Sequence, residues 1–419
     1  MKAQIIVIGD ELLSGRISDA NTAPLARWLE STGFHLSRVI LTRDKEDELL
    51  PLLKSAWEDS DLVITTGGLG PTKDDITKQV FDLFINGPGG TLSESVEARE
   101  LVTSHYQRIN KVWSPTTNHY HMLPKNLGVF SNPKGLAPGL IWESSNKVLL
   151  ATPGVPRELM AMIEGPMPEI LARNFKLPRI TDQNLIFKTH SIPEEIIFFE
   201  LMPNLWNELE EVGKVSSLPQ VMGVDIVVTF KGTKQDLIRE EKKWEELLIK
   251  SPLAPHLWSV GPALIEEAVV KRAQEKGLTF GFAESCTGGL VGHRITNVMG
   301  SSSVFKGSLV TYANEAKENI LKVSSDSLKE FGAVSEQVAQ QMAKGAREAL
   351  SVDLAVSLTG IAGPGGGSEE KPVGTICIGQ ASSKESRSKR YQMYGSRDHL
   401  KRRFSEIALF GLLKLIDTF

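Results

Sequence analysis

Glycine-rich loops that directly follow short apolar runs constrain this sequence more than any other feature. The run at 61–66 leads into a loop with three glycines at 67–70, and the runs at 278–282 and 354–358 are also followed by glycine-containing loops. A strand, a glycine loop and a helix in succession are typical of a layer built on a mostly parallel sheet. We therefore predict an α/β fold with two α/β domains whose sheets are mostly parallel.

The pattern divides the 419 residues into three parts, and two or three domains are typical of that length. We predict an α/β domain at 1–168, a small α+β module at 169–255 and a second α/β domain at 256–419. The middle module contains no chemical cluster and ends in a proline-containing stretch at 251–255 that reads as a linker. We therefore interpret it as a structural connector.

Composition excludes several classes of protein. Hydrophobic residues make up 41% and charged residues 23%, which indicates a globular chain. The net charge of -4 lacks the basic excess of nucleic-acid-binding proteins, so no nucleic-acid partner is expected. Cys286 and Cys377 have no disulfide or zinc spacing. No apolar run approaches the roughly 18 residues that a bilayer span needs, so we expect a cytoplasmic protein without a membrane partner.

The loop at 67–75 is a candidate site for a nucleotide or phosphate, because backbone N–H groups at the start of a helix attract anions. The same glycines could instead serve a tight turn with positive φ. The loop also contains Thr72, Asp74 and Asp75. The adjacent carboxylates could hold a divalent metal, or Asp74 could cap the helix. The acidic pair at 10–11 follows the first strand and should lie at the same sheet edge.

Ser285 is a candidate nucleophile, because it lies where a strand turns into a helix and N–H groups there could stabilise an oxyanion. A serine needs a base, and Lys317 could act as one if burial keeps it neutral. Three alternatives remain open. Ser285 could be an N-cap, Lys317 could be a solvated helix lysine, and Cys286 could be the nucleophile.

The motifs of the last domain closely resemble the CinA (competence/damage-inducible) family. They include Ala-Glu-Ser-Cys-Thr-Gly-Gly at 283–289, Thr-Tyr-Ala-Asn-Glu-Ala-Lys at 311–317 and Thr-Gly-Ile-Ala-Gly-Pro at 359–364. In that family the domain is a nicotinamide mononucleotide deamidase, PncC, which is a serine amidohydrolase with a Ser–Lys pair. The resemblance implies nicotinamide mononucleotide as substrate and no cofactor.

Carried onto this sequence, the resemblance implies Ser285 as nucleophile, Lys317 as base and Tyr312 as an assisting residue. The substrate-binding residues that it implies are Thr287, Gly288, Gly289, Thr359, Gly360, Gly363 and Arg397. The stretch at 384–403 is rich in Lys and Arg, and it is either a solvated face or a means of neutralising a phosphate. Whether Arg397, Arg402 or Arg403 holds the phosphate stays open.

The first domain is similar to the molybdopterin-binding domain of MoaB and MogA proteins, and the middle module resembles the KH-type domain of full-length CinA proteins. In these proteins the first domain is associated with metal-dependent ADP-ribose pyrophosphatase activity. The implied nucleotide-site residues are Gly9, Asp10, Gly67, Gly68, Gly70, Thr72, Pro153 and Gly154. The implied ligands of a divalent metal, with or without a monovalent cation, are Glu11, Asp74 and Asp75. The alternative is a molybdopterin- or nucleotide-binding domain without catalysis. A homodimer is also expected.

Overall fold

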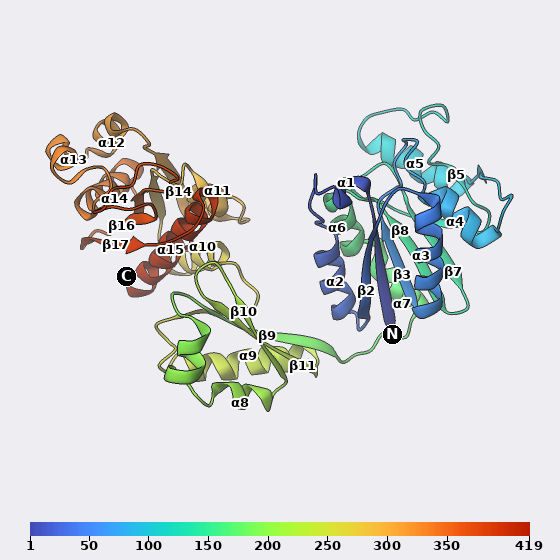
Figure 1. The fold of residues 1–419 in the computed structure, drawn as a ribbon, viewed down its shortest axis with the longest axis horizontal. Coiled ribbons are helices and arrows are strands. Elements are labelled where there is room, and N and C mark those ends of the chain that lie inside the picture. The colour runs from blue at the N-terminus through green and yellow to red at the C-terminus, as the bar shows by residue number, and fades with distance from the viewer. The chain divides into compact units, whose positions relative to one another are not determined.

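The computed structural model describes residues 1–419, which form two compact units (Figure 1). The first unit comprises Met1–Gln183 and Lys231–Thr233. The second comprises Asn184–Phe230 and Lys234–Phe419, so the middle module and the last α/β layer belong to one unit.

The first unit contains a six-stranded sheet in the order β2-β1-β3-β8-β7-β6. Its strands are β1 (Lys2–Ile8), β2 (His35–Thr42), β3 (Leu62–Thr66), β6 (Gly128–Phe130), β7 (Gly139–Ser144) and β8 (Lys147–Thr152). The first four strands in this order are parallel, and β7 and β6 add an antiparallel edge. All residues of β3 are buried, because helices cover both faces of the sheet.

Two hydrophobic cores lie on the two faces of this sheet, and Figure 1 shows the helices that cover both faces. One face packs against α2 (Thr22–Ser31), α6 (Pro156–Glu164) and α7 (Pro166–Asn174). The other packs against α3 (Glu46–Asp59), α4 (Thr77–Asn86) and α5 (Val96–Arg108). The short helix α1 (Asp10–Leu13) follows β1, and β4 (Ser93–Glu94) pairs with β5 (Met122–Leu123).

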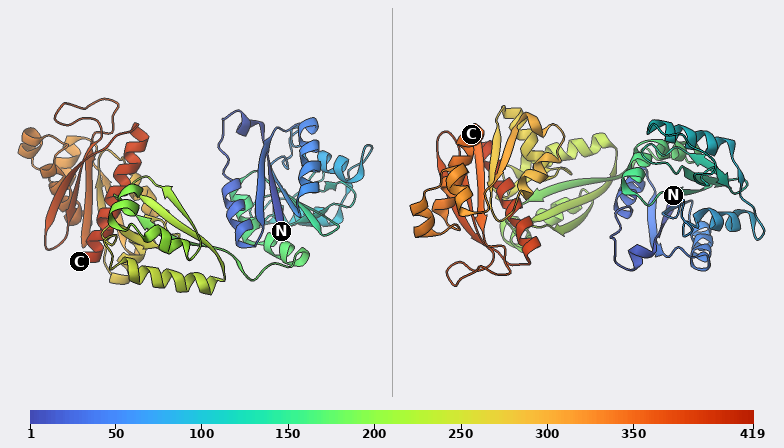
Figure 2. Two further views of the ribbon diagram at one scale, coloured as in Figure 1. Left: turned by 60° about the horizontal axis from the view of Figure 1, so that its bottom comes forward. Right: turned by 90° about the horizontal axis from the view of Figure 1, so that it is seen from above.

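The middle module is α+β, with a sheet in the order β10-β11-β9-β12 (Figure 2). Its elements are β9 (Thr181–Thr189), the π-helical turn η1 (Ile196–Leu201), α8 (Leu205–Glu210), β10 (Lys214–Pro219), β11 (Val224–Gly232), α9 (Lys234–Leu248) and β12 (Leu257–Val260). Side chains of α8 and α9 share one core with the sheet. Helix α7 of the first unit continues past residue 168, and strand β12 of the middle sheet lies just after residue 255. Both elements therefore cross or follow the predicted domain boundaries by a few residues.

The last layer has the sheet order β14-β13-β15-β16-β17. Its strands are β13 (Phe280–Glu284), β14 (Phe305–Val310), β15 (Leu354–Gly360), β16 (Thr375–Ala381) and β17 (Ser386–Gln392). The first three strands in this order are parallel, whereas β16 and β17 are antiparallel. The predicted fold class, two α/β layers with mostly parallel sheets and a small α+β module, is confirmed.

Helices also cover both faces of this second α/β sheet. One face packs against α10 (Ile265–Lys276), α11 (Leu290–Thr296) and α15 (Arg397–Thr418). The other packs against α12 (Asn314–Leu321), α13 (Ser325–Phe331) and α14 (Glu336–Leu350). The turn η2 (Ser301–Ser303) precedes β14. Ser335 caps α14, because its hydroxyl accepts the N–H of Val338.

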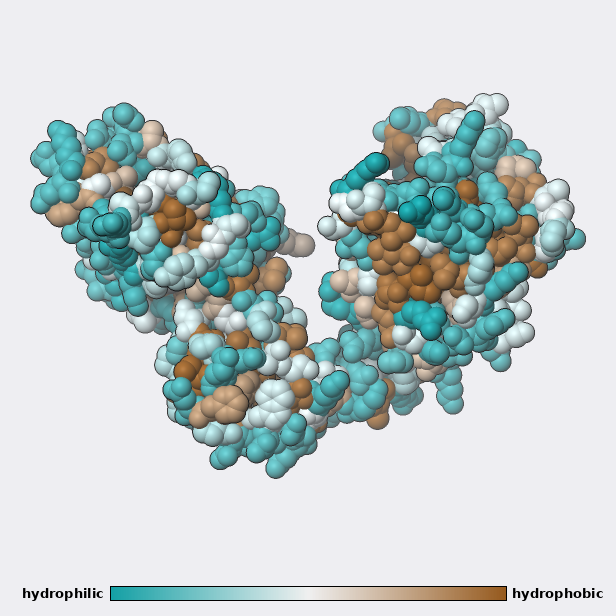
Figure 3. Space-filling view, viewed as in Figure 1, coloured by the Kyte–Doolittle hydropathy of each residue, from teal (hydrophilic) through white to brown (hydrophobic).

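Hydrophilic residues cover most of the visible face of both units, with hydrophobic residues gathered in smaller patches between them (Figure 3). None of the helices combines the length and the apolar character that crossing a bilayer would require.

Candidate functional site

The carboxyl ends of the three parallel strands of the second α/β layer meet around Ser285. Strand β13 ends at Glu284, whose carbonyl accepts the N–H of Thr311 at 2.8 Å, directly after β14. The N–H of Ser285 donates to the carbonyl of Leu358 in β15 at 3.0 Å. Ligands of open α/β sheets bind at this edge. The nucleophile candidate is therefore held between two neighbouring strand ends.

The turn after Ser285 leaves backbone donors free. Helix α11 begins at Leu290 with Gly289 as its N-cap, so Ser285 does not cap it. The N–H of Gly288 donates back to the carbonyl of Ser285 at 3.1 Å. The N–H groups of Cys286 and Thr287 donate to no other residue, and the N–H of Cys286 contacts its own thiol. These two donors, next to the serine hydroxyl, are available to a developing oxyanion.

Lys317 reaches this turn from α12 and is only 1% exposed, so the alternative of a solvated helix lysine is wrong. Its Nζ lies 3.2 Å from Ser285 Oγ, 2.9 Å from the carbonyl oxygen of Thr311 and 3.1 Å from that of Tyr312. No carboxylate forms an ion pair with it. Burial lowers the pKa of Lys317, because the charged form loses its hydration.

The three oxygen partners of Lys317 Nζ suit an ammonium as well as a neutral amine. A neutral amine has two N–H donors and one lone pair, whereas an ammonium has three donors and no acceptor. In the neutral form, the two backbone carbonyls take the two N–H groups, and the lone pair faces the hydroxyl of Ser285. This is the arrangement in which a lysine accepts a proton from a serine.

Cys286 is the neighbouring thiol, and it is 6% exposed. Burial raises its pKa to about 12, so the thiol stays protonated at neutral pH. A protonated thiol is a poor nucleophile, which leaves Ser285 as the stronger candidate of the two.

Glu284 is a buried residue of the site that sequence reasoning missed as a functional group. Its carboxylate accepts the N–H groups of Gly289 (3.0 Å), Val291 (3.1 Å) and Gly292 (2.9 Å), and the hydroxyl of Ser308 (2.7 Å). It thereby joins the strand end to the first turn of α11 and fixes the loop between them. One signal in the sequence could have indicated this role, namely a lone acidic residue at the end of an apolar run. Because a buried charge must be paired, such a residue is expected to bind donors close by.

Several of the residues implied as substrate-binding lie around this pair. The hydroxyl of Thr287 is buried and has no partner within the protein. The hydroxyl of Thr359 instead donates to the carbonyl of Ala333 at 2.7 Å. Arg397 donates to the carbonyl of Gly363 at 2.6 Å, and its second nitrogen lies 3.5 Å from the hydroxyl of Tyr312. The structure thus brings Tyr312, Gly363 and Arg397 together.

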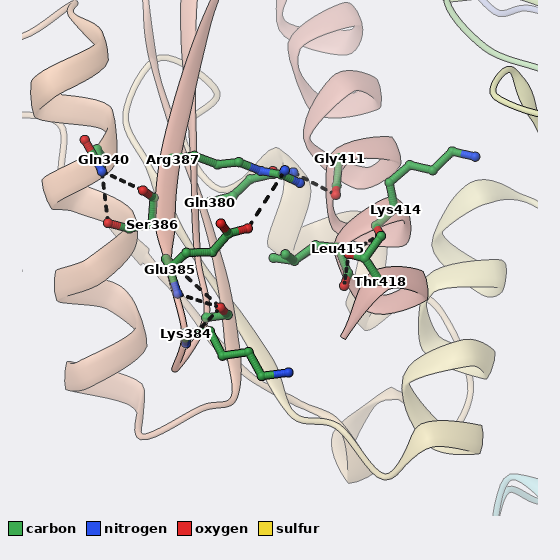
Figure 4. Close-up of polar contacts among 11 residues, drawn as sticks. Gln340, Gln380, Lys384, Glu385, Ser386, Arg387, Gly411, Lys414, Leu415 and Thr418 are labelled. Atoms are coloured by element: carbon green, nitrogen blue, oxygen red, sulfur yellow. Dashed lines mark hydrogen bonds and ion pairs between the residues drawn. The ribbon is translucent and has the colours of Figure 1, made fainter.

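The basic stretch at 384–403 divides between two ends of the sheet. Arg387 of β17 pairs with Gln380 of β16, and Gln380 in turn pairs with Val356 of β15. Val356 lies well before the carboxyl end of β15, so Arg387 is far from that end of the sheet. Figure 4 shows this first part held by local contacts, with Arg387 donating to Gln380 at 2.8 Å and lying 3.9 Å from Glu385. Arg390, further along β17, pairs with Cys377, which pairs with Thr359 near the carboxyl end of β15, so the later part of the stretch lies at the end of the sheet that carries Ser285.

In the first unit, the side chain of Asn21 joins the loops at the carboxyl ends of β3 and β8. Its Nδ2 donates to Thr66 Oγ1 at 2.9 Å and to the carbonyl of Gly154 at 2.8 Å. Gly67 and Gly68 have φ values of +109° and +65°, so the tight-turn interpretation holds for both. The structure therefore places the glycine loop beside the Pro153–Gly154 turn, as the sequence placed them by pattern.

The two aspartates of the loop differ. The carboxylate of Asp75 accepts the N–H groups of Gly70 (2.6 Å) and Thr72 (2.8 Å) and the hydroxyl of Thr72, so it is used to shape the loop. Asp74 does not cap α4, which begins at Thr77 without a side-chain cap. A hydrogen bond from Thr72 lowers the pKa of Asp74, which keeps that exposed carboxylate ionised.

Asp44 is a second residue that sequence reasoning missed. Burial raises its pKa, and the negative charges of Glu11, Asp10 and Asp74 add to the rise. Its Oδ2 accepts the N–H of Asp10 at 3.1 Å. Four carboxylates are therefore neighbours at this sheet edge, although no three His, Cys, Asp or Glu side chains converge as a ready-made metal site.

Lys78 supplies a positive charge near the same loop. Its Nζ donates to the carbonyl of His119 at 2.8 Å and lies 5.6 Å from the ring centre of Tyr120. Burial lowers its pKa to about 8, and the charge of Asp75 opposes the decrease. No sequence motif singles out this lysine, because its burial depends on the distant 109–121 segment.

Known proteins resemble both parts of the chain. Residues 263–416 match the family described as "CinA C-terminal domain", and residues 4–172 match "Probable molybdopterin binding domain". A CinA-like protein of Chloroherpeton thalassium is 36% identical, with 100% of each chain covered. A CinA-like protein of Salinibacter ruber is 35% identical, with 98% of each chain covered.

Solved structures of proteins with the same family name each match only part of this chain. The competence/damage inducible protein CihA from Agrobacterium tumefaciens is 40% identical, covers 38% of this chain and 98% of its own, and has a TM-score of 0.35. The protein CinA from Thermoplasma acidophilum is 32% identical over 41% of this chain and 99% of its own, with a TM-score of 0.37. On the full-length matches, this chain belongs to the CinA family and combines a molybdopterin-binding-type N-terminal domain with a CinA C-terminal domain.

Proposed function

We propose that the C-terminal domain is an amidohydrolase that converts nicotinamide mononucleotide to nicotinate mononucleotide and ammonia. The observation that carries the proposal is the buried pair in which Lys317 Nζ lies 3.2 Å from Ser285 Oγ. The resemblance of the surrounding motifs to the deamidase supports the choice of substrate.

The reaction would proceed in two stages. Neutral Lys317 accepts the proton of Ser285, whose oxygen attacks the carboxamide carbon. The N–H groups of Cys286 and Thr287 donate to the resulting oxyanion, and the unpaired hydroxyl of Thr287 is free to contact the amide. The carbon–nitrogen bond then breaks, and ammonia leaves with the proton returned by Lys317. Water attacks the acyl ester, again giving a proton to Lys317, and releases the carboxylate product and free Ser285.

The first test is ammonia release from nicotinamide mononucleotide by the full-length protein, compared with its Ser285→Ala variant. We expect release by the wild type and loss in the variant. Equal release by the two proteins would refute the assignment of Ser285.

For the N-terminal domain we propose a second function. This function is the cleavage of the pyrophosphate of ADP-ribose with the help of a divalent metal. Asp44 and the three carboxylates that act on it, those of Asp10, Glu11 and Asp74, support this function, because hard oxygen ligands suit Mg²⁺. Mg²⁺ usually binds one or two carboxylates and takes further ligands from substrate phosphates, so a complete protein cage is unnecessary. One or two of the carboxylates of Glu11, Asp44 and Asp74 would hold the ion, whereas Asp75 maintains the loop.

When bound, such an ion neutralises phosphate charge. The protein's own contribution would be to bind and orient the substrate, with Lys78 and the free loop donors facing the anion. Hydrolysis of ADP-ribose with and without a chelator tests this function. Chelator-insensitive hydrolysis would refute the metal role, and binding of a pterin without any hydrolysis would favour the alternative of a binding domain.

A further inference from the structure

The first two turns of α15 carry four cations, and three of them have protein partners. Arg402 pairs with Asp398 at 3.0 Å. Arg403 donates to the carbonyls of Tyr394 (3.1 Å) and Val221 (3.4 Å). Arg397 donates to Gly363 and approaches Tyr312. The fourth, Lys401, forms no hydrogen bond or ion pair with the protein.

Lys401 lies against the loop that follows the nucleophile. Its Nζ is 3.9 Å from the position that a Cβ on Gly288 would occupy, and no other atom lies within 4 Å of that position. Gly288 itself is tied to Ser285 by its N–H. The positive charge of Lys401 also interacts electrostatically with the thiol of Cys286. An unpaired cation therefore lies next to the loop that follows the reacting hydroxyl.

A pocket of about 380 Å³ opens beside this lysine, between the start of α11 at Leu290 and α15. It contains two acids, but both are already paired. Asp398 pairs with Arg402, and Glu406 pairs with Arg294 at 2.7 Å. An anion entering the pocket would thus meet no free carboxylate, and Lys401 is the cation that can pair with it.

The gap between Lys401 and the loop depends on the residue at 288. Gly288 has a φ of +64°, a conformation that side-chain-bearing residues rarely adopt. Because glycine lacks a Cβ, the space in front of Lys401 Nζ stays open. A phosphate oxygen needs such close access to form a charge-assisted hydrogen bond.

We infer that Lys401 binds the 5′-phosphate of the substrate and thereby makes the enzyme select a nucleotide over the corresponding nucleoside. The inference rests on the proposed deamidase function. It differs from the expectation that Arg397, Arg402 or Arg403 holds the phosphate, because those three side chains have other partners. Lys401 would act in binding and take no part in proton transfer.

The experiment measures binding, so that it does not depend on turnover. Full-length protein with Ser285→Ala is titrated calorimetrically with nicotinamide mononucleotide and with nicotinamide riboside, which lacks the phosphate. Lys401→Met is then added, with Lys344→Met, at an exposed position of α14, as the control and Lys401→Arg to restore the charge. We expect Lys401→Met to weaken binding of the mononucleotide about 10- to 100-fold and to leave the riboside within about twofold.

Lys344→Met should change the affinity for neither ligand, and Lys401→Arg should recover most of the affinity for the mononucleotide. An unchanged mononucleotide affinity in Lys401→Met, or an equal loss for both ligands, would overturn the inference. A phosphate-selective loss in Arg397→Met without one in Lys401→Met would overturn it as well. Turnover by the protein with Ser285 intact is assayed separately, so failure of the deamidase function is recognised independently.

Discussion

The hydroxyl oxygen of Ser285 lies 3.2 Å from the side-chain nitrogen of Lys317, although 32 positions separate the two in sequence. Ser285→Ala removes the nucleophile and leaves the base in place. We expect deamidase kcat to fall at least about 10³-fold, whereas Cys286→Ala should change it only a few-fold because that thiol stays protonated. Ammonia release from nicotinamide mononucleotide measures both, and a larger loss in the cysteine variant would reverse the assignment.

The pH dependence of deamidase activity should reveal the protonation state of the proposed base, Lys317. Protonated Lys317 cannot accept a proton, so activity should be low in acid and rise as the lysine loses its proton. Since burial lowers the pKa of Lys317, the rise should occur below the ordinary lysine value of about 10.4. Lys317→Met should abolish turnover and retain substrate affinity. A kcat/KM profile that is highest in acid would contradict a lysine base.

Glu284 should act on the nucleophile through the loop. Glu284→Ala leaves three amide donors and one hydroxyl without their shared partner, and each buried unpaired group costs about 1–3 kcal/mol. We expect a clear decrease in Tm, with a smaller decrease for Glu284→Gln. In the Gln variant, kcat should fall more than KM rises, because Ser285 loses its position. Glu348→Gln, which changes an exposed glutamate of α14, should alter neither quantity.

Acid should destabilise the second unit through His190. This ring stacks on Phe410 with centres 4.0 Å apart, and burial, helped by His256 and Lys414, lowers its pKa to about 3. The unfolded chain binds the proton near the ordinary value of about 6.5, so stability is lost as pH falls between these two values. The loss is on the order of 2–3 kcal/mol by pH 4. Chemical denaturation of His190→Phe should show a flatter pH dependence, and the exposed-residue control His293→Asn should follow the wild type.

In the N-terminal domain, the charge of Lys78 should govern binding of an anionic substrate. Its pKa of about 8 means that the positive charge is present below that pH and is lost above it. KM for ADP-ribose should therefore rise from about pH 8 upward, and Lys78→Met should raise KM at pH 7 and remove this dependence. Lys125→Met, at an exposed position, is the control. A pH-dependent KM that persists in Lys78→Met would refute the role.

The strands were predictable because a strand buried on both faces reads as a continuous apolar run, as in β3, β8 and β15. The glycine loops followed from the same pattern. The burial of Lys317 was not predictable from residue type, because it depends on the packing of α12 over the ends of β13 and β14. The residues alone left Lys317 open as either a base or a solvated lysine, and the resemblance to a known family favoured the base.

The first unit shows the opposite case. Local spacing pointed to Asp75 as a metal ligand, yet its carboxylate satisfies donors within its own loop. Asp44 went unnoticed, because a parallel sheet brings it beside Asp10 from a different strand end. The roles of Asp75 and Asp44 both depend on which hydrogen-bond donors the fold leaves unpaired. The spacing of residues in the sequence does not show which donors those are.

The most direct test of the account is to incubate the purified full-length protein with nicotinamide mononucleotide and identify the products by mass, beside the Ser285→Ala and Lys317→Met variants. We predict nicotinate mononucleotide and ammonia from the wild type and neither from the two variants. Nicotinate mononucleotide formed by the Ser285→Ala variant at the wild-type rate would contradict the Ser285–Lys317 mechanism, and none formed by the wild type would contradict the proposed activity.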